Sequence, residues 1–70
     1  MQIIKIRDEY IKLGQALKLA GAVESGVEAK MCIQDGCVYV NGKVELQRGK
    51  KLYSGDVINF EDEEYTILGE

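Results

Sequence analysis

Several side chains of this 70-residue chain have the chemistry to bind anions. Arg48, Lys50 and Lys51 flank Gly49 in a polar segment, where a flexible glycine backbone can approach a phosphate closely. The other candidates lie on segments that we predict to be helices or strands, and they are Lys12, Lys18, Lys30, Gln34 and Lys43. These residue types alone leave two interpretations open: binding of nucleic-acid phosphates, or a merely solvated charged face.

Catalytic chemistry has little support in the sequence. The chain has no His, no Gly-x-Ser-x-Gly motif, no glycine-rich phosphate loop and no metal-ligand spacing. Four consecutive acids, Glu61, Asp62, Glu63 and Glu64, resemble a general acid/base or metal site only superficially, because adjacent carboxylates are usually a solvated, mutually repelling run. We therefore expect no enzymatic activity, no metal and no cofactor.

The two cysteines, Cys32 and Cys37, are too few for a disulfide scaffold or for a four-ligand zinc site. Free cysteine is among the most buried residue types, so we expect both to be small core side chains. A redox pair remains as the alternative, although the spacing is not that of a Cys-x-x-Cys motif.

The net charge of −3 conceals an asymmetry along the chain. Residues 1–52 contain all nine Lys and Arg residues and six acids, which gives +3. Residues 53–70 contain the other six acids and no base, which gives −6. A basic face can therefore coexist with an acidic edge.

The length predicts one small domain, residues 1–70, which buries only about 60% of its unfolded surface. No apolar run approaches the roughly 18 residues that span a bilayer. The N-terminal residues show no signal-peptide pattern. We expect a cytoplasmic monomer without membrane association.

Hydrophobic spacing predicts an edge strand at Gln2–Ile6 and then two helices. The first helix is expected at residues 11–22, with Gly21 at its end and with Gly14 near its start, where a neighbouring backbone can approach closely. The second is expected from Ser25, in a capping box with Glu28, to about residue 35, with Gly36 as its stop. The short link between them predicts a tight helical pair.

The second half of the chain is rich in strand signals. Strands are expected at residues 37–40 and 43–45, joined by a type I′ turn at Asn41-Gly42. We expect a loop at residues 46–51, a lone buried anchor at Leu52 and a turn at residues 54–56. Val57–Phe60 and residues 65–68 should form a hairpin across the four acids. The predicted fold class is α+β, a two-helix pair packed on a small, mostly antiparallel sheet.

This ordered set of residues resembles the RNA-binding domain family of small-subunit ribosomal protein S-four, also called the alpha-L RNA-binding motif. The resemblance covers about residues 10–60. The matching residues are Lys12-Leu13, Leu17, Ser25, Ala29-Lys30, Ile33, Gly36, Val38, Val40-Asn41-Gly42 and Gly55-Asp56-Val57. More narrowly, the chain resembles a small stand-alone bacterial branch of this family. The residues that carry this narrower resemblance are Leu13-Gly14-Gln15, Leu17-Lys18-Leu19, Ser25-Gly26 and Glu45-x-x-Arg48-Gly49-x-Lys51-Leu52.

The resemblance implies a non-catalytic, ribosome-associated protein that docks structured RNA, either ribosomal or transfer RNA. It implies that Lys12, Lys30 and Gln34 lie on the RNA-facing side of the helices, and that the loop residues Arg48, Lys50 and Lys51 add phosphate contacts. Tyr39 is expected to pack within its strand, with a hydrogen bond to RNA as the alternative.

Two other functions remain open from the sequence. One is a protein-interaction adaptor that uses the acidic residues 61–64 to meet a basic partner. The other is a β-grasp sulfur carrier, which residues 40–43 and 55–58 resemble superficially. Such carriers end in Gly-Gly, whereas this chain ends in Leu68-Gly69-Glu70.

Overall fold

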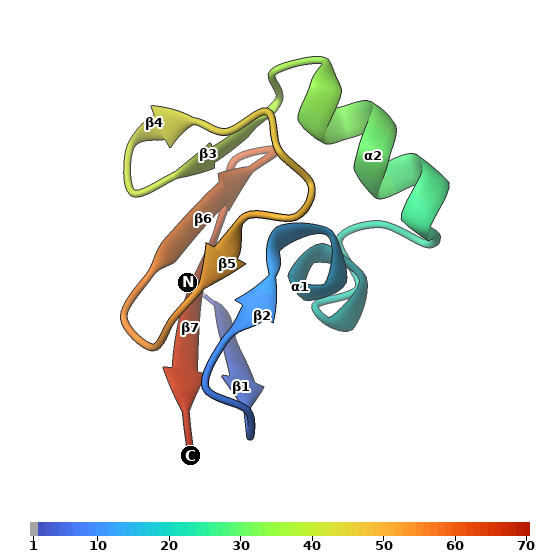
Figure 1. Cartoon of the computed structure of the whole chain (residues 1–70). Helices are drawn as coiled ribbons and strands as arrows, with labels where there is room; N and C mark the ends of the chain where they lie inside the picture. Colours follow the sequence, from blue (N-terminus) through green and yellow to red (C-terminus); the bar gives the residue numbers. More distant parts are fainter. Residues whose placement is uncertain (1) are drawn as a thin grey trace.

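Two helices pack on one face of a five-stranded sheet, as the computed structural model of residues 2–70 shows (Figure 1). The helices are α1 (Leu13–Leu19) and α2 (Gly26–Gln34). The sheet order is β1 (Gln2–Ile6), β7 (Glu63–Gly69), β6 (Val57–Phe60), β3 (Val38–Val40) and β4 (Lys43–Val44). Strand β1 pairs with β7 in parallel and every other pair is antiparallel, so the predicted α+β fold class and edge strand are confirmed.

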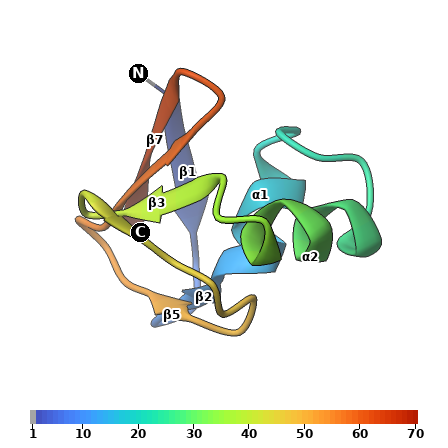
Figure 2. The ribbon, with the colours of Figure 1, turned by 90° about the horizontal axis from the view of Figure 1, so that it is seen from above.

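A second, two-stranded sheet joins β2 (Ile11–Lys12) to β5 (Lys51–Leu52). In Figure 2 this short pair lies beside the N-terminal end of α1, apart from the main sheet. The predicted helix at residues 11–22 was therefore too long at its start, because Ile11 and Lys12 pair with Leu52 and Lys51 before the helix begins. It was also too long at its end, because Ala20 is the C-cap and Gly21 has a left-handed φ of 74°.

Helix α2 begins and ends at the residues that the sequence indicated. The Ser25 hydroxyl oxygen accepts a hydrogen bond from the Glu28 N–H at 3.1 Å. The reciprocal half of the predicted capping box differs, because the Glu28 carboxylate accepts from the N–H of Glu24 at 2.8 Å instead of that of Ser25. At the other end Asp35 is the C-cap and Gly36 has a φ of 79°, so Gly36 ends the helix as expected.

Two tight turns close the hairpins of the main sheet. Asn41 and Gly42 both have positive φ, 52° and 84°, which confirms the type I′ turn between β3 and β4. The turn between β6 and β7 is shorter than the predicted four acids. Only Glu61 and Asp62 occupy it, with φ of 51° and 64°, because Phe60 pairs directly with Glu63.

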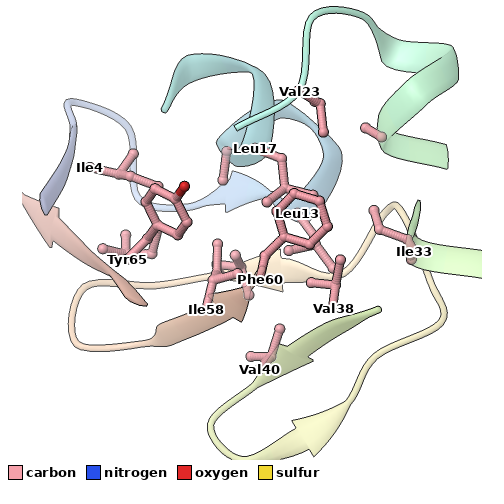
Figure 3. Packing of buried hydrophobic residues seen from close by; sticks show 14 of the residues in the cluster. Ile4, Leu13, Leu17, Val23, Ile33, Val38, Val40, Ile58, Phe60 and Tyr65 are labelled. Carbon is pink, nitrogen blue, oxygen red and sulfur yellow. The ribbon is translucent and has the colours of Figure 1, made fainter. Parts of the chain in front are cut away.

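The core lies between the helices and the sheet, where apolar side chains from both meet (Figure 3). Leu13 and Leu17 from α1, Ile33 from α2, and Val38 and Ile58 from the sheet are fully buried. Leu52 is fully buried too, which confirms the predicted anchor, although it belongs to strand β5.

The prediction that both cysteines are core residues was wrong for one of them. Cys32 is half-buried on α2 and packs against the core, but Cys37 is exposed. The reason is strand alternation: Val38 and Val40 point into the core, so a residue directly before Val38 is directed away from it.

Candidate nucleic-acid interface

The segment before β5 is hydrogen-bonded to the first turn of α1. The Leu13 N–H donates to the Lys50 carbonyl at 2.9 Å, and the Gly14 N–H donates to the Arg48 carbonyl at 3.1 Å. These amides have no partner within the helix, because the first N–H groups of any α-helix lack an acceptor one turn back. The loop that carries these cations is thereby held against α1, which carries Lys18 and is preceded by Lys12 at its N-cap.

Gly14 allows this contact because it has no side chain. A Cβ atom at this position would lie 2.6 Å from Cγ of Arg48, which is closer than real Cβ contacts come. The Arg48 backbone does approach Gly14, because its carbonyl accepts the Gly14 N–H at 3.1 Å. The missing side chain, however, makes room for the side chain of Arg48, since the Arg48 carbonyl oxygen would lie at an ordinary contact distance of 3.7 Å from a Cβ atom.

Cations from both segments meet around one hollow of about 390 Å³, which we call the basic hollow. Its charged lining consists of Lys12, Lys18 and Arg48, all three exposed to solvent. The rest of the lining is Gly14, Gln15, Gly26 and Gly49. No carboxylate lines it, so the hollow suits an anion.

Two more predicted residues, Lys50 and Lys51, flank the hollow without lining it. Lys51 pairs with Lys12 in the β2–β5 sheet, and its Nζ atom lies 4.7 Å from the ring centroid of Tyr10. This is a cation–π geometry that fixes the direction of the lysine side chain. Lys50 is exposed and contributes its carbonyl to the contact with Leu13.

The remaining predicted residues lie farther from the basic hollow. Lys30 and Gln34 are exposed and adjacent on α2, a helix that meets the hollow only at Gly26. Lys43 follows the Asn41-Gly42 turn on β4, the edge strand of the main sheet. Lys43 does not line the basic hollow, and its strand β4 forms one edge of the main sheet (Figure 1).

A second hollow, of about 510 Å³, adjoins the first and was not predicted. We call it the N-terminal hollow, and its lining consists of Lys5, Ile6, Arg7, Asp8, Tyr10, Ile11, Gln15, Lys18 and Leu19. Gln15 and Lys18 line both hollows. Two signals in the sequence point to it: Lys5 and Arg7 belong to the basic part of the chain, and Gln15 stands midway between Lys12 and Lys18, one turn from each.

The acidic turn lies in a different region. Glu61 and Asp62 line a third hollow, of about 360 Å³, together with Cys37, Tyr39 and Asn59. Burial raises the pKa of the Cys32 thiol, and the negative charges of Glu28, Glu61 and Asp35 raise it further. Acidic side chains from α2 and from the β6–β7 turn are thus close enough to Cys32 to influence it. Tyr39 is exposed in the third hollow, contrary to the expectation that it packs within its strand, and the acids make its surroundings unfavourable for RNA.

Residues 2–70 show neither a metal site nor a membrane-spanning helix. No group of three or more His, Cys, Asp or Glu side chains in this range is arranged to hold a metal ion. No helix in the same range has the length and apolar character to cross a membrane.

Comparison with known proteins gives relatives along nearly the whole chain. The family model described as S4 domain matches residues 4–68. A Bacillus subtilis (strain 168) protein named "Probable ribosome maturation protein RlbA" is 47% identical over 58 residues, which cover 83% of this chain and 82% of that protein. YbcJ of Escherichia coli (strain K12), named as a candidate RNA-binding protein, is 39% identical over 51 residues, 73% of each chain.

The fold also matches a solved structure. The solution structure of Escherichia coli YbcJ, described as revealing an alfaL motif involved in RNA binding, superposes with a TM-score of 0.74 and 30% identity. The match covers 97% of this chain and 87% of that one. Neither an adaptor nor a sulfur carrier, the alternatives raised from the sequence, is named among these relatives. The family model, the sequence relatives and the shared fold agree, and the chain belongs to the S4 domain family.

Proposed function

We propose that this chain is a non-catalytic protein that docks structured RNA, with ribosomal RNA as the first candidate, through the basic hollow and the adjoining face of α1. The observation that carries the proposal is the meeting of Lys12, Lys18 and Arg48 around a hollow without a carboxylate. The names of the relatives support it, since one refers to ribosome maturation and others to RNA binding.

The proposed contacts are made by side chains. The first backbone N–H groups of α1, at Leu13 and Gly14, already donate to the loop carbonyls and are not free for a phosphate. Lys12, Lys18 and Arg48 neutralise phosphates, and the Arg48 guanidinium can contact one through two parallel hydrogen bonds. Such contacts recognise the spacing of phosphates on folded RNA and read little of its sequence.

The other predicted residues contribute to RNA binding to different extents in this proposal. Lys50 and Lys51 extend the positive charge on the loop side, and Lys30 and Gln34 extend the surface along α2. Lys43 makes no contact, because it lies on the edge strand β4. One copy of the chain binds the RNA in this proposal, and the binding takes place in the cytoplasm.

Crosslinking in living cells, followed by sequencing of the bound RNA, tests the proposal. We expect ribosomal RNA fragments to be enriched with the wild type and to be lost with the triple variant Lys12→Glu, Lys18→Glu, Arg48→Glu. Because all three side chains are exposed, the variant should keep its fold, which circular dichroism checks. Equal recovery of RNA with both proteins would refute the proposed site, and recovery of none with the wild type would refute the function.

A further inference from the structure

We propose that the N-terminal hollow receives one unpaired nucleotide of the RNA, an inference that rests on the proposed function. The hollow combines a surface for the base of a nucleotide with positive charge for its phosphate. Tyr10, Ile11 and Leu19 offer aromatic and apolar surface for a base, while Lys5, Arg7 and Lys18 offer positive charge for its phosphate. Its volume of about 510 Å³ lies in the range of about 300–1,000 Å³ typical of small-ligand sites.

The position of this hollow connects it to the proposed docking surface. Gln15 and Lys18 lie between the two hollows and line both of them. An RNA backbone held by Lys12 and Arg48 in the basic hollow therefore passes Lys18 before it reaches the second hollow. A base that leaves the RNA stack at this point enters the N-terminal hollow while its phosphate stays beside Lys18.

Tyr10 is held in place in the absence of RNA. Its ring is tilted by 51° against that of Tyr53, with the centroids 6.0 Å apart. The Nζ atom of Lys51 lies 4.7 Å from its centroid. A half-buried ring with two such neighbours loses little freedom when a base packs against it. Tyr53 supports Tyr10 but does not line the hollow.

The polar groups of the hollow are available to a nucleotide. Arg7 pairs with Glu70 at 3.5 Å, but the two side chains are 89% and 56% exposed, so a phosphate can replace the carboxylate. The Gln15 side-chain oxygen accepts from the Lys12 N–H at the long distance of 3.4 Å, which leaves its amide free to hydrogen-bond a base edge. Asp8 is one carboxylate against three cations, and the hollow remains positive.

Two RNA probes and two variants test this inference. The probes are a fluorescein-labelled blunt-ended RNA duplex and the same duplex with one bulged adenine. We expect the wild type to bind the bulged RNA roughly 10-fold more tightly, in line with the stacking of one base on an aromatic ring. Tyr10→Leu should abolish this preference and leave the binding of the fully paired RNA unchanged. The matched variant Tyr53→Leu should retain most of the preference, because Tyr53 does not line the hollow.

Each outcome bears on one of the two proposals. Equal binding of both RNAs by the wild type would refute the nucleotide site and leave the proposed function standing. Equal losses for Tyr10→Leu and Tyr53→Leu would also refute the site, because the tyrosines would then act only as a structural pair. Failure to bind either RNA would refute the proposed function as well.

A titration with adenosine monophosphate, followed by ¹H–¹⁵N NMR, gives a readout that does not depend on the choice of RNA. We expect the amide signals of Tyr10, Ile11, Gln15 and Leu19 to shift. The signal of Asn59, which lines the third hollow and neither of the other two, should stay in place. Shifts of equal size at Asn59 would indicate unspecific binding and would refute the site.

Discussion

Among single residues, Gly14 has the most direct influence on the candidate site, because its missing side chain lets Arg48 reach α1. Gly14→Ala gains up to about 1 kcal/mol of helix propensity. It also places a methyl group 2.6 Å from Arg48 Cγ, and such overpacking costs about 1–3 kcal/mol. We expect a net loss of about 1 kcal/mol in the free energy of unfolding, measured by urea denaturation, together with weaker RNA binding.

Gly26→Ala is the matched control for this substitution. Gly26 also lines the basic hollow, but a Cβ atom there would meet no other atom within 4 Å. This variant should be as stable as the wild type or more stable, by up to about 1 kcal/mol. If both glycine variants were stabilised equally, the close packing of Arg48 on Gly14 would not exist in solution.

At the scale of elements, the Ser25 cap determines where α2 begins. Ser25→Ala removes the oxygen that accepts from the Glu28 N–H, and the loss of such a cap costs about 1 kcal/mol. Ser25→Asn keeps an acceptor of suitable length and should recover most of that stability. Urea denaturation of the three proteins measures the difference, and equal stability of the alanine and asparagine variants would contradict the assigned cap.

The elements that the sequence predicts well are those with local signals. The start of α2 is encoded by Ser25, its end by Gly36, and the β3–β4 turn by Asn41-Gly42, all within a few residues of the element concerned. The β2–β5 pair was missed because two-residue strands have no hydrophobic period, and because the paired residues, Ile11 with Leu52 and Lys12 with Lys51, are far apart in the sequence. The same absence of a local signal made the first helix appear longer than α1.

The sequence predicted which types of residue form the candidate site, but not which of the predicted residues lie together in the folded chain. The basic part of the chain identified Lys12, Lys18 and Arg48, which line the basic hollow together. It could not show that Lys43 does not line this hollow, because the position of β4 depends on the order of strands in the sheet. The N-terminal hollow was missed for a similar reason, since β1 leads Lys5 and Arg7 toward α1 only in the folded chain.

At the scale of the whole molecule, a tyrosine in the core, Tyr65, makes the free energy of unfolding depend on pH. Burial raises the pKa of the Tyr65 hydroxyl above its ordinary value of 10.0, and the neighbouring Glu63 and Glu61 raise it further. Above pH 10 the unfolded chain loses this proton while the native state keeps it, so the free energy of unfolding falls as pH rises through this window.

The variant Tyr65→Phe isolates this effect because it keeps the buried ring and removes the ionisable group. Urea denaturation between pH 8 and about pH 11 should show a shallower fall in stability for the variant than for the wild type. Parallel pH profiles for the two proteins would contradict the assigned role of Tyr65.

The whole molecule also separates its charges, with cations around α1 and acids at the β6–β7 turn. The central claim is that RNA binds at the cationic region, and two matched charge reversals test it. Lys18 and Lys43 are both exposed lysines, but only Lys18 lines the basic hollow and the N-terminal hollow. The measurement is the affinity for the fluorescein-labelled RNA duplex as a function of salt concentration.

With about four phosphates engaged, we expect the logarithm of the wild-type association constant to fall against the logarithm of salt concentration with a slope of about −3 to −4. Lys18→Glu should weaken binding about 10-fold and make the slope shallower by about 1, whereas Lys43→Glu should change neither by much. A wild-type affinity that does not respond to salt, or equal losses for the two variants, would contradict the account.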